Sequence, residues 1–141
     1  MQHEYPNKML RRPDLLYPDL SYKIIGAAFT VYNELGWGHR EAVYQRAFAK
    51  TLDELGIAFT REHPVTTSYH GVIVGRAFLD FIVEGKVVVE LKVIPKMGYV
   101  HINQVVAYLT GTHLPLAILI YFLKDGVRYR RIIRRGEENG N

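Results

Sequence analysis

Cysteine is absent from the 141 residues of the chain. Its absence excludes a disulfide framework, a thiolate nucleophile, a cysteine-ligated zinc ion and a cysteine-held iron–sulfur cluster. Serine occurs only at positions 21 and 68, and neither lies in the context of a nucleophile. The sequence also has no glycine-rich phosphate loop, and its histidines lack the spacing of a zinc site. We therefore expect the chemistry of the chain to rest on carboxylates, lysine and amides.

Long apolar runs are missing as well. The longest run, "LPLAILIYFL" at residues 114–123, is too short to span a bilayer. The first residues, "MQHEYPNKMLRRP", lack the apolar centre of a signal peptide. We expect a soluble protein with no membrane partner, and the absence of cysteine is compatible with a reducing cytoplasm.

Basic charge is concentrated in one place. Residues 128–135, "RYRRIIRR", hold five arginines and no acid, whereas the rest of the chain holds 13 basic and 14 acidic side chains. Such a stripe could contact the phosphates of a nucleic acid. It is equally typical of an edge strand whose charges prevent pairing with other chains. The candidate nucleic-acid-binding residues are Arg128, Arg130, Arg131, Arg134 and Arg135.

Hydrophobic periodicity predicts one α/β domain. Two helices end at Gly36 and Gly56, with Asp19 or Ser21 as the first N-cap and with Val43, Ala47, Leu52 and Leu55 on the buried face of the second. A strand interrupted at Pro64, a hairpin, a third helix and two more strands follow. The order ααβββαββ implies a mixed sheet flanked by helices. The predicted boundaries are an N-terminal arm at 1–17, the domain at 18–135 and a disordered tail at 136–141.

Three charged residues interrupt the apolar strands of the hairpin "FLDFIVEGKVVVELKVIP" at residues 78–95, apart from those of its "EGK" turn. Glu90 and Lys92 lie two apart on a strand, so their side chains leave the same face. With a two-residue turn of "EG", Glu90 would lie on the opposite face from Asp80. With a three-residue loop of "EGK", Asp80 would lie directly opposite Glu90. The sequence leaves both registers open.

Two carboxylates that face each other in a partly buried sheet repel and require compensation. Magnesium or manganese would provide it, because both ions prefer oxygen ligands, and Lys92 could then act on a bound water. The alternative is structural: an ion pair of Lys92 with Asp80 or Glu90, or carboxylates exposed at an open rim. The spacing alone does not decide between these interpretations.

The two neighbouring helices add polar stripes. Glu41, Tyr44 and Gln45 have the i, i+3, i+4 spacing that places side chains on one helix face. The later helix repeats this spacing with another set of three: His101, Gln104 and Tyr108. Each stripe alone is compatible with a solvated face, but both accompany the charged hairpin.

Together these motifs resemble a known family. "GHREAVY" at residues 38–44 matches the G-x-x-E-x-x-Y motif of the GxxExxY proteins, a branch of the PD-(D/E)XK nuclease superfamily. "FLDFIVEGKVVVELKV" resembles the catalytic hairpin of that family, and "INQVVAYL" resembles its Q-x-x-x-Y helix. The resemblance covers roughly residues 18–133. It implies a restriction-endonuclease-like fold whose αβββαβ core is preceded by one further helix.

The resemblance also assigns roles to residues. It implies that Asp80 and Glu90 bind a metal ion, with the backbone carbonyl of Leu91 as a third ligand. Glu41 corresponds to a helix acid that reaches the metal directly or through water. Lys92 would position the attacking water and stabilise negative charge.

The remaining matched residues lie around that centre. Gln104 would orient Lys92 or a phosphate oxygen. The supporting residues are Tyr44, Tyr108 and, as a weaker candidate, His101.

The resemblance thus implies a nuclease dependent on Mg²⁺, or on Mn²⁺ in its place, that hydrolyses phosphodiester bonds in DNA, with RNA as the second choice. The alternative is a nucleic-acid-binding or assembly module that keeps the nuclease fold without turnover. A homodimer is compatible with the sequence, because a small catalytic domain often needs a partner to hold a duplex.

Overall fold

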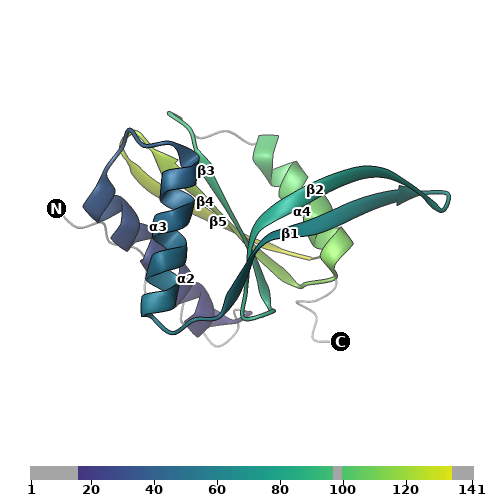
Figure 1. Ribbon diagram of the computed structural model, residues 1–141, viewed down its shortest axis with the longest axis horizontal. Helices are drawn as coiled ribbons and strands as arrows, with labels where there is room; N and C mark the ends of the chain where they lie inside the picture. The colour runs from purple at the N-terminus through teal and green to yellow at the C-terminus, as the bar shows by residue number, and fades with distance from the viewer. Residues whose placement is uncertain (1–15, 97–99, 135–141) are drawn as a thin grey trace. The chain divides into compact units, whose positions relative to one another are not determined.

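The computed structural model describes residues 16–96 and 100–134 of the chain (Figure 1). The predicted arm at 1–17, apart from its last two residues, and the predicted tail at 136–141 lie outside this part. The predicted order of helices and strands is confirmed. The elements are α2 (Pro18–Leu35), α3 (Glu41–Glu54), β1 (Phe59–Tyr69), β2 (Val72–Val83), β3 (Val87–Val93), α4 (Val100–Thr112), β4 (Leu116–Leu123) and β5 (Gly126–Ile133).

The strands form a mixed five-stranded sheet in the order β1-β2-β3-β4-β5. The β1–β2 and β2–β3 pairs are antiparallel. Helix α4 connects β3 to β4, as expected of a crossover between neighbouring strands. The predicted interruption at Pro64 is wrong, because β1 continues through this residue. Proline is tolerated within β1 because β1 is an edge strand, where a residue without an N–H need not break a hydrogen bond of the sheet.

The chain divides into two compact units. Among the described residues, the first unit comprises 16–57, 91–96 and 120–130. The second comprises 58–90, 100–119 and 131–134. The first unit therefore contains α2 and α3, and the second contains the long β1–β2 hairpin and α4 (Figure 1).

Helix α2 begins one residue before the predicted N-cap. Pro18 occupies its first turn, where the missing N–H costs no hydrogen bond, and Tyr17 is the N-cap. The prediction of Asp19 or Ser21 as the cap is wrong: Asp19 lies in the first turn, and Ser21 is fully buried in the helix. An acid in the first turn still favours the helix through its dipole. Gly36 ends the helix as predicted, with a φ of 69°.

The buried face of α3 agrees with the predicted one at Leu52 but not at Val43, Ala47 and Leu55. Val43 is only half-buried and Leu55 is 54% exposed, although the periodicity placed both in the core. The buried residues are four apart: Tyr44, Phe48 and Leu52. Within the same unit the Tyr44 ring stacks on Phe122 of β4, with ring centroids 4.6 Å apart. This aromatic contact fixes the rotation of the helix.

In the second unit, β1 and β2 form a long hairpin that projects as a twisted ribbon beside α4 (Figure 1). Val65 faces α4, and the glycine at 111 lets the helix approach it closely. A Cβ at Gly111 would lie 2.8 Å from Cγ1 of Val65, closer than real side-chain contacts. Glycine is therefore required for this contact between helix and strand.

Candidate metal and catalytic centre

The loop between β2 and β3 has three residues, Glu84 to Lys86. Val83 pairs with Val87, and Phe81 pairs with Val89. The loop is closed by the Lys86 N–H, which donates to the Val83 carbonyl at 2.9 Å. Gly85 has a φ of 66°, the left-handed conformation that glycine adopts at little cost. The three-residue alternative is therefore the observed one, and Asp80 and Glu90 are the residues next to its last recorded pair, Phe81 and Val89.

The Glu90 carboxylate accepts a hydrogen bond from the backbone of Asp80 on the neighbouring strand. The backbone N–H of Asp80 donates to Oε2 of Glu90 at 2.6 Å. Glu90 is only 2% exposed, and Asp80 is half-buried. A buried carboxylate is costly unless it is hydrogen-bonded or paired with a cation, and a second acid across the strand adds repulsion. This arrangement favours a function that uses the charge.

Helix α4 places Tyr108 near the two acids. Its side chain is half-buried, and its pKa is raised first by burial and then by the negative charges of Glu90 and Asp80. The phenol therefore stays protonated and able to donate a hydrogen bond beside the acids. Gln104, one turn earlier, is exposed. The His101 side chain lies outside the described residues.

In the first unit, Glu41 connects α3 to the end of β3. Glu41 is the first residue of the helix, where the dipole favours an acid. Its Oε1 accepts a hydrogen bond from the Val93 N–H at 3.3 Å. Lys92 directly precedes Val93 and is half-buried. The helix acid predicted from the motif thus lies at the strand segment that carries the predicted lysine.

Tyr44 holds the turn that precedes Glu41. Its hydroxyl donates to the Gly36 carbonyl and accepts a bond from the His39 N–H at 3.4 Å. The side chain is fully buried. Tyr44 therefore acts on the glycine turn and on the start of α3, so its effect on Glu41 is one of positioning. The tyrosine of the motif thus has a structural reason to accompany its acid.

The donors of the acid pair suit a hard divalent cation. Asp80 and Glu90 offer carboxylate oxygens, the ligands that Mg²⁺ prefers. The part of the chain that the structure describes contains no cluster of three or more His, Cys, Asp or Glu side chains suited to a metal. Two carboxylates are sufficient for Mg²⁺, which usually keeps several waters and binds one or two acids. The residues therefore fit magnesium better than they fit zinc, which usually takes nitrogen and sulfur ligands.

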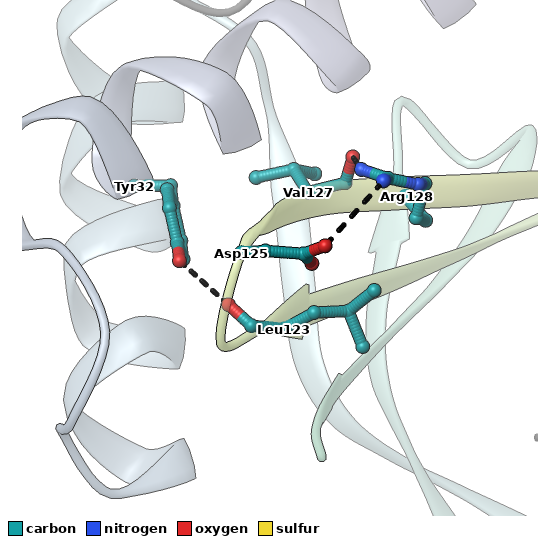
Figure 2. Close-up of polar contacts among 5 residues, drawn as sticks. All are labelled: Tyr32, Leu123, Asp125, Val127 and Arg128. Atoms are coloured by element: carbon teal, nitrogen blue, oxygen red, sulfur yellow. Dashed lines mark hydrogen bonds and ion pairs between the residues drawn. The ribbon is translucent and has the colours of Figure 1, made fainter. Parts of the chain in front are cut away.

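Residues 128–133 of the arginine stripe lie on the edge strand β5, and Arg134 directly follows it. Arg128 pairs with Asp125 of the preceding turn, with 4.0 Å between the charged atoms (Figure 2). Arg134 donates to the carbonyl oxygens of Leu114 and His113, so it has a structural task. Arg128 and Arg130 are exposed, whereas Arg131 is half-buried. Arg135 lies outside the described residues.

Two lysines that the sequence did not single out lie near Arg128. A hollow of about 770 Å³ in the first unit is lined by Pro95, Lys96, Leu123, Lys124, Asp125 and Arg128. Its three cations outnumber its single acid. Lys96 and Lys124 follow the ends of β3 and β4, so their approach depends on the pairing of those strands. No local sequence pattern could have indicated it.

The comparison with protein families identifies the chain. A family model described as the PD-(D/E)XK nuclease superfamily matches residues 18–135. The chain belongs to this superfamily. No curated protein matches it significantly.

The solved structures that the chain matches include two with TM-scores below 0.5. The crystal structure of SSO0001 has a TM-score of 0.46 at 12% identity, covering 82% of this chain and 77% of its own. An alkaline exonuclease (LHK-Exo) from Laribacter hongkongensis has a TM-score of 0.42 at 13% identity, covering 93% of this chain and 76% of its own.

Among the described helices, none has the length and apolar character needed to cross a membrane.

Proposed function

We propose that this protein is a divalent-metal-dependent nuclease of the GxxExxY type, with DNA as its substrate and RNA as the second choice. The observation that carries the proposal is the buried Glu90, whose carboxylate bonds to the backbone of Asp80 on the neighbouring strand. Membership of a nuclease superfamily gives this costly arrangement a chemical purpose.

Asp80 and Glu90 are the proposed ligands of Mg²⁺, which Mn²⁺ can replace. The backbone carbonyl of Leu91 is the proposed third ligand, and Glu41 is proposed to reach the ion directly or through water. When bound, the ion would polarise a phosphate oxygen and acidify the attacking water. The short bond from the Asp80 N–H keeps one Glu90 oxygen fixed, so the carboxylate is oriented before substrate arrives.

Lys92 is proposed to position the attacking water and to stabilise the negative charge that develops on the phosphate. It lies two residues after Glu90 on the continuous strand β3, so strand alternation directs both side chains to one face. A lysine ammonium stabilises the developing negative charge. Gln104 is proposed to orient Lys92 or a phosphate oxygen, and Tyr108 is proposed to support the acids as a neutral donor.

Cleavage assays with single variants test this proposal. Purified protein is incubated with end-labelled single-stranded or duplex DNA and Mg²⁺, and cutting is followed on denaturing gels. Lys92→Met is expected to reduce the rate at least about 100-fold, as for other groups that assist proton transfer or stabilise charge. Glu90→Gln is expected to abolish cutting, because it removes a metal ligand.

Lys50→Met is the matched control, because Lys50 is an exposed lysine of α3 outside the proposed site. Cutting by the Lys92→Met protein at the normal rate would remove Lys92 from the mechanism. Metal-independent DNA binding by a wild-type protein that never cuts would identify the chain as a binding or assembly module. Running RNA beside DNA decides the substrate, and gel filtration decides whether the active species is a homodimer.

A further inference from the structure

An exposed aromatic side chain lies on the same face of β2 as the acid Asp80. Phe78 is 64% exposed, although phenylalanine is a residue of protein interiors. It precedes Asp80 by two residues on a strand, so both side chains leave the same face. Arg76, a further two residues away, belongs to this face and is also exposed. Ring, guanidinium and acid therefore form one row with a spacing of about 6.7 Å.

The register of the hairpin makes this row a continuous surface. Phe78 pairs with Pro64 and Arg76 pairs with Thr66, and all four residues are exposed. The opposite face of β2 is the one that the protein buries, with Leu79 fully buried. The fold therefore does not need the Phe78 ring for its core.

The charge of the surface fits a polyanion. Residues 63–79 contain Arg76 and two histidines, and the acids Glu62 and Asp80 directly flank this range. Within the part of the chain that the structure describes, the Arg76 side chain has no hydrogen bond or ion pair. A cation and an aromatic ring that lead toward a nuclease centre are the components of a single-strand-binding surface.

We infer that this row binds an unpaired segment of the nucleic-acid substrate next to the bond that is cut. The Phe78 ring stacks on a base adjacent to the scissile phosphate, and Arg76 contacts a phosphate further along the strand. The inference rests on the proposed nuclease function and names its substrate class: a single strand, or a duplex end that has opened. Paired bases cannot offer their faces to the ring, so the surface selects against an intact duplex.

Binding assays without metal test the inference separately from cleavage. A fluorescein-labelled oligothymidylate and a blunt duplex are titrated with protein in EDTA, and fluorescence anisotropy gives the dissociation constants. Phe78→Ala is expected to weaken single-strand binding roughly 5- to 150-fold, the range for loss of one stacked base. Duplex binding is expected to change much less, so the preference for single strands falls.

Three further variants separate stacking from other effects. Phe78→Trp should retain binding, whereas Phe78→Leu, which keeps an apolar side chain but no aromatic face, should lose it. Arg76→Gln should lower the slope of log affinity against log salt by about 0.7, the value for one phosphate contact with a single strand. Tyr69→Ala is the matched control, because Tyr69 is also 64% exposed but lies at the far end of the same hairpin, next to its turn.

Several results would overturn the inference. Wild-type affinity of Phe78→Leu would exclude stacking, and an equal loss in Tyr69→Ala would indicate undifferentiated apolar binding. A shift from dimer to monomer on gel filtration of Phe78→Ala would assign the face to contact between two copies. Cleavage with no dependence of binding on Phe78 contradicts this inference alone, whereas Phe78-dependent binding without cleavage contradicts the nuclease alone.

Discussion

At the scale of single residues, Tyr32 combines packing with a buried polar contact. Its hydroxyl donates to the Leu123 carbonyl at 2.6 Å (Figure 2), and its ring is parallel to that of Phe122. The pKa of Tyr32 is raised, chiefly by burial and further by the charges of Tyr44 and Asp125, against a smaller opposing effect of the Gly126 backbone. Ionisation of this phenol would therefore place a charge in the packed interior of the first unit.

Tyr32→Phe should lower the free energy of unfolding at neutral pH. It should also make this free energy fall less as the pH rises into the alkaline range. The loss at neutral pH should be about 1–2 kcal/mol, because the Leu123 carbonyl loses its donor. The native pKa of Tyr32 lies above the ordinary value of 10.0, so the unfolded state releases this proton first as the pH rises. The contribution of Tyr32 is thus complete below pH 10.0 and is lost above it.

Urea unfolding at about pH 7 and about pH 10.5 measures both effects, since phenols ionise near pH 10. The Tyr32→Phe protein should lose less stability between the two conditions than the wild type. Tyr69→Phe is the control, because this tyrosine is 64% exposed. An alkaline decline of the same size in both variants and the wild type would contradict the assignment to Tyr32.

Residue-level reasoning from the sequence singled out charged positions, whose roles stay predictions, and it misplaced Tyr44. Asp80, Glu90 and Lys92 stand out because charges interrupt an apolar run. Tyr44 has the spacing of a polar face, yet the structure buries it completely on Phe122, and its hydroxyl reaches the glycine turn. A tyrosine can pack its ring in the core while its hydroxyl bonds to a turn. Whether Tyr44 does so depends on its partner on β4, which the sequence of α3 does not show.

At the scale of elements, the loop from Glu84 to Lys86 sets the register of the proposed site. Gly85→Ala should destabilise the protein by about 1–2 kcal/mol, because a side chain is unfavourable in the left-handed conformation. Its φ of 66° is strained for alanine even though an added Cβ would meet no atom within 4 Å.

The control for this variant is Gly75→Ala on the same strand. There an added Cβ meets Thr67 at 3.7 Å, an ordinary van der Waals contact, and the backbone is not left-handed. Urea unfolding should show a clear loss for Gly85→Ala and little change for Gly75→Ala. Equal stability of the two variants would show that the loop tolerates other conformations and does not fix the register by itself.

The elements themselves were largely readable from the sequence. Alternation and glycines predicted the hairpin, and the two open registers differed only in whether Lys86 belongs to the loop. The rotation of α3 was not readable, because Val43 and Tyr44 both continue an apolar stripe and the choice depends on β4. The N-cap of α2 was also missed, since Pro18 starts the helix without a side-chain cap.

At the scale of the whole molecule, the proposed metal site at Asp80 and Glu90 would link metal binding to stability. Glu90 is held at 2% exposure with the Asp80 backbone as a donor. Without a cation, the repulsion of two acids opposes folding. An ion that binds only the folded state stabilises it by mass action.

Thermal unfolding with and without divalent metal should therefore separate wild type from Glu90→Gln. Metal at about 100 times its dissociation constant should stabilise the wild type by about 2.7 kcal/mol, which raises the Tm by roughly 5–10 °C for a chain of this size. Glu90→Gln should lose this increase, while its metal-free Tm should equal or exceed that of the wild type because a buried charge is removed. Asp53→Asn, at an exposed acid of α3, should keep the full metal response. A metal-dependent increase of the same size in Glu90→Gln would place the ion elsewhere and would leave the burial of Glu90 to a structural cause.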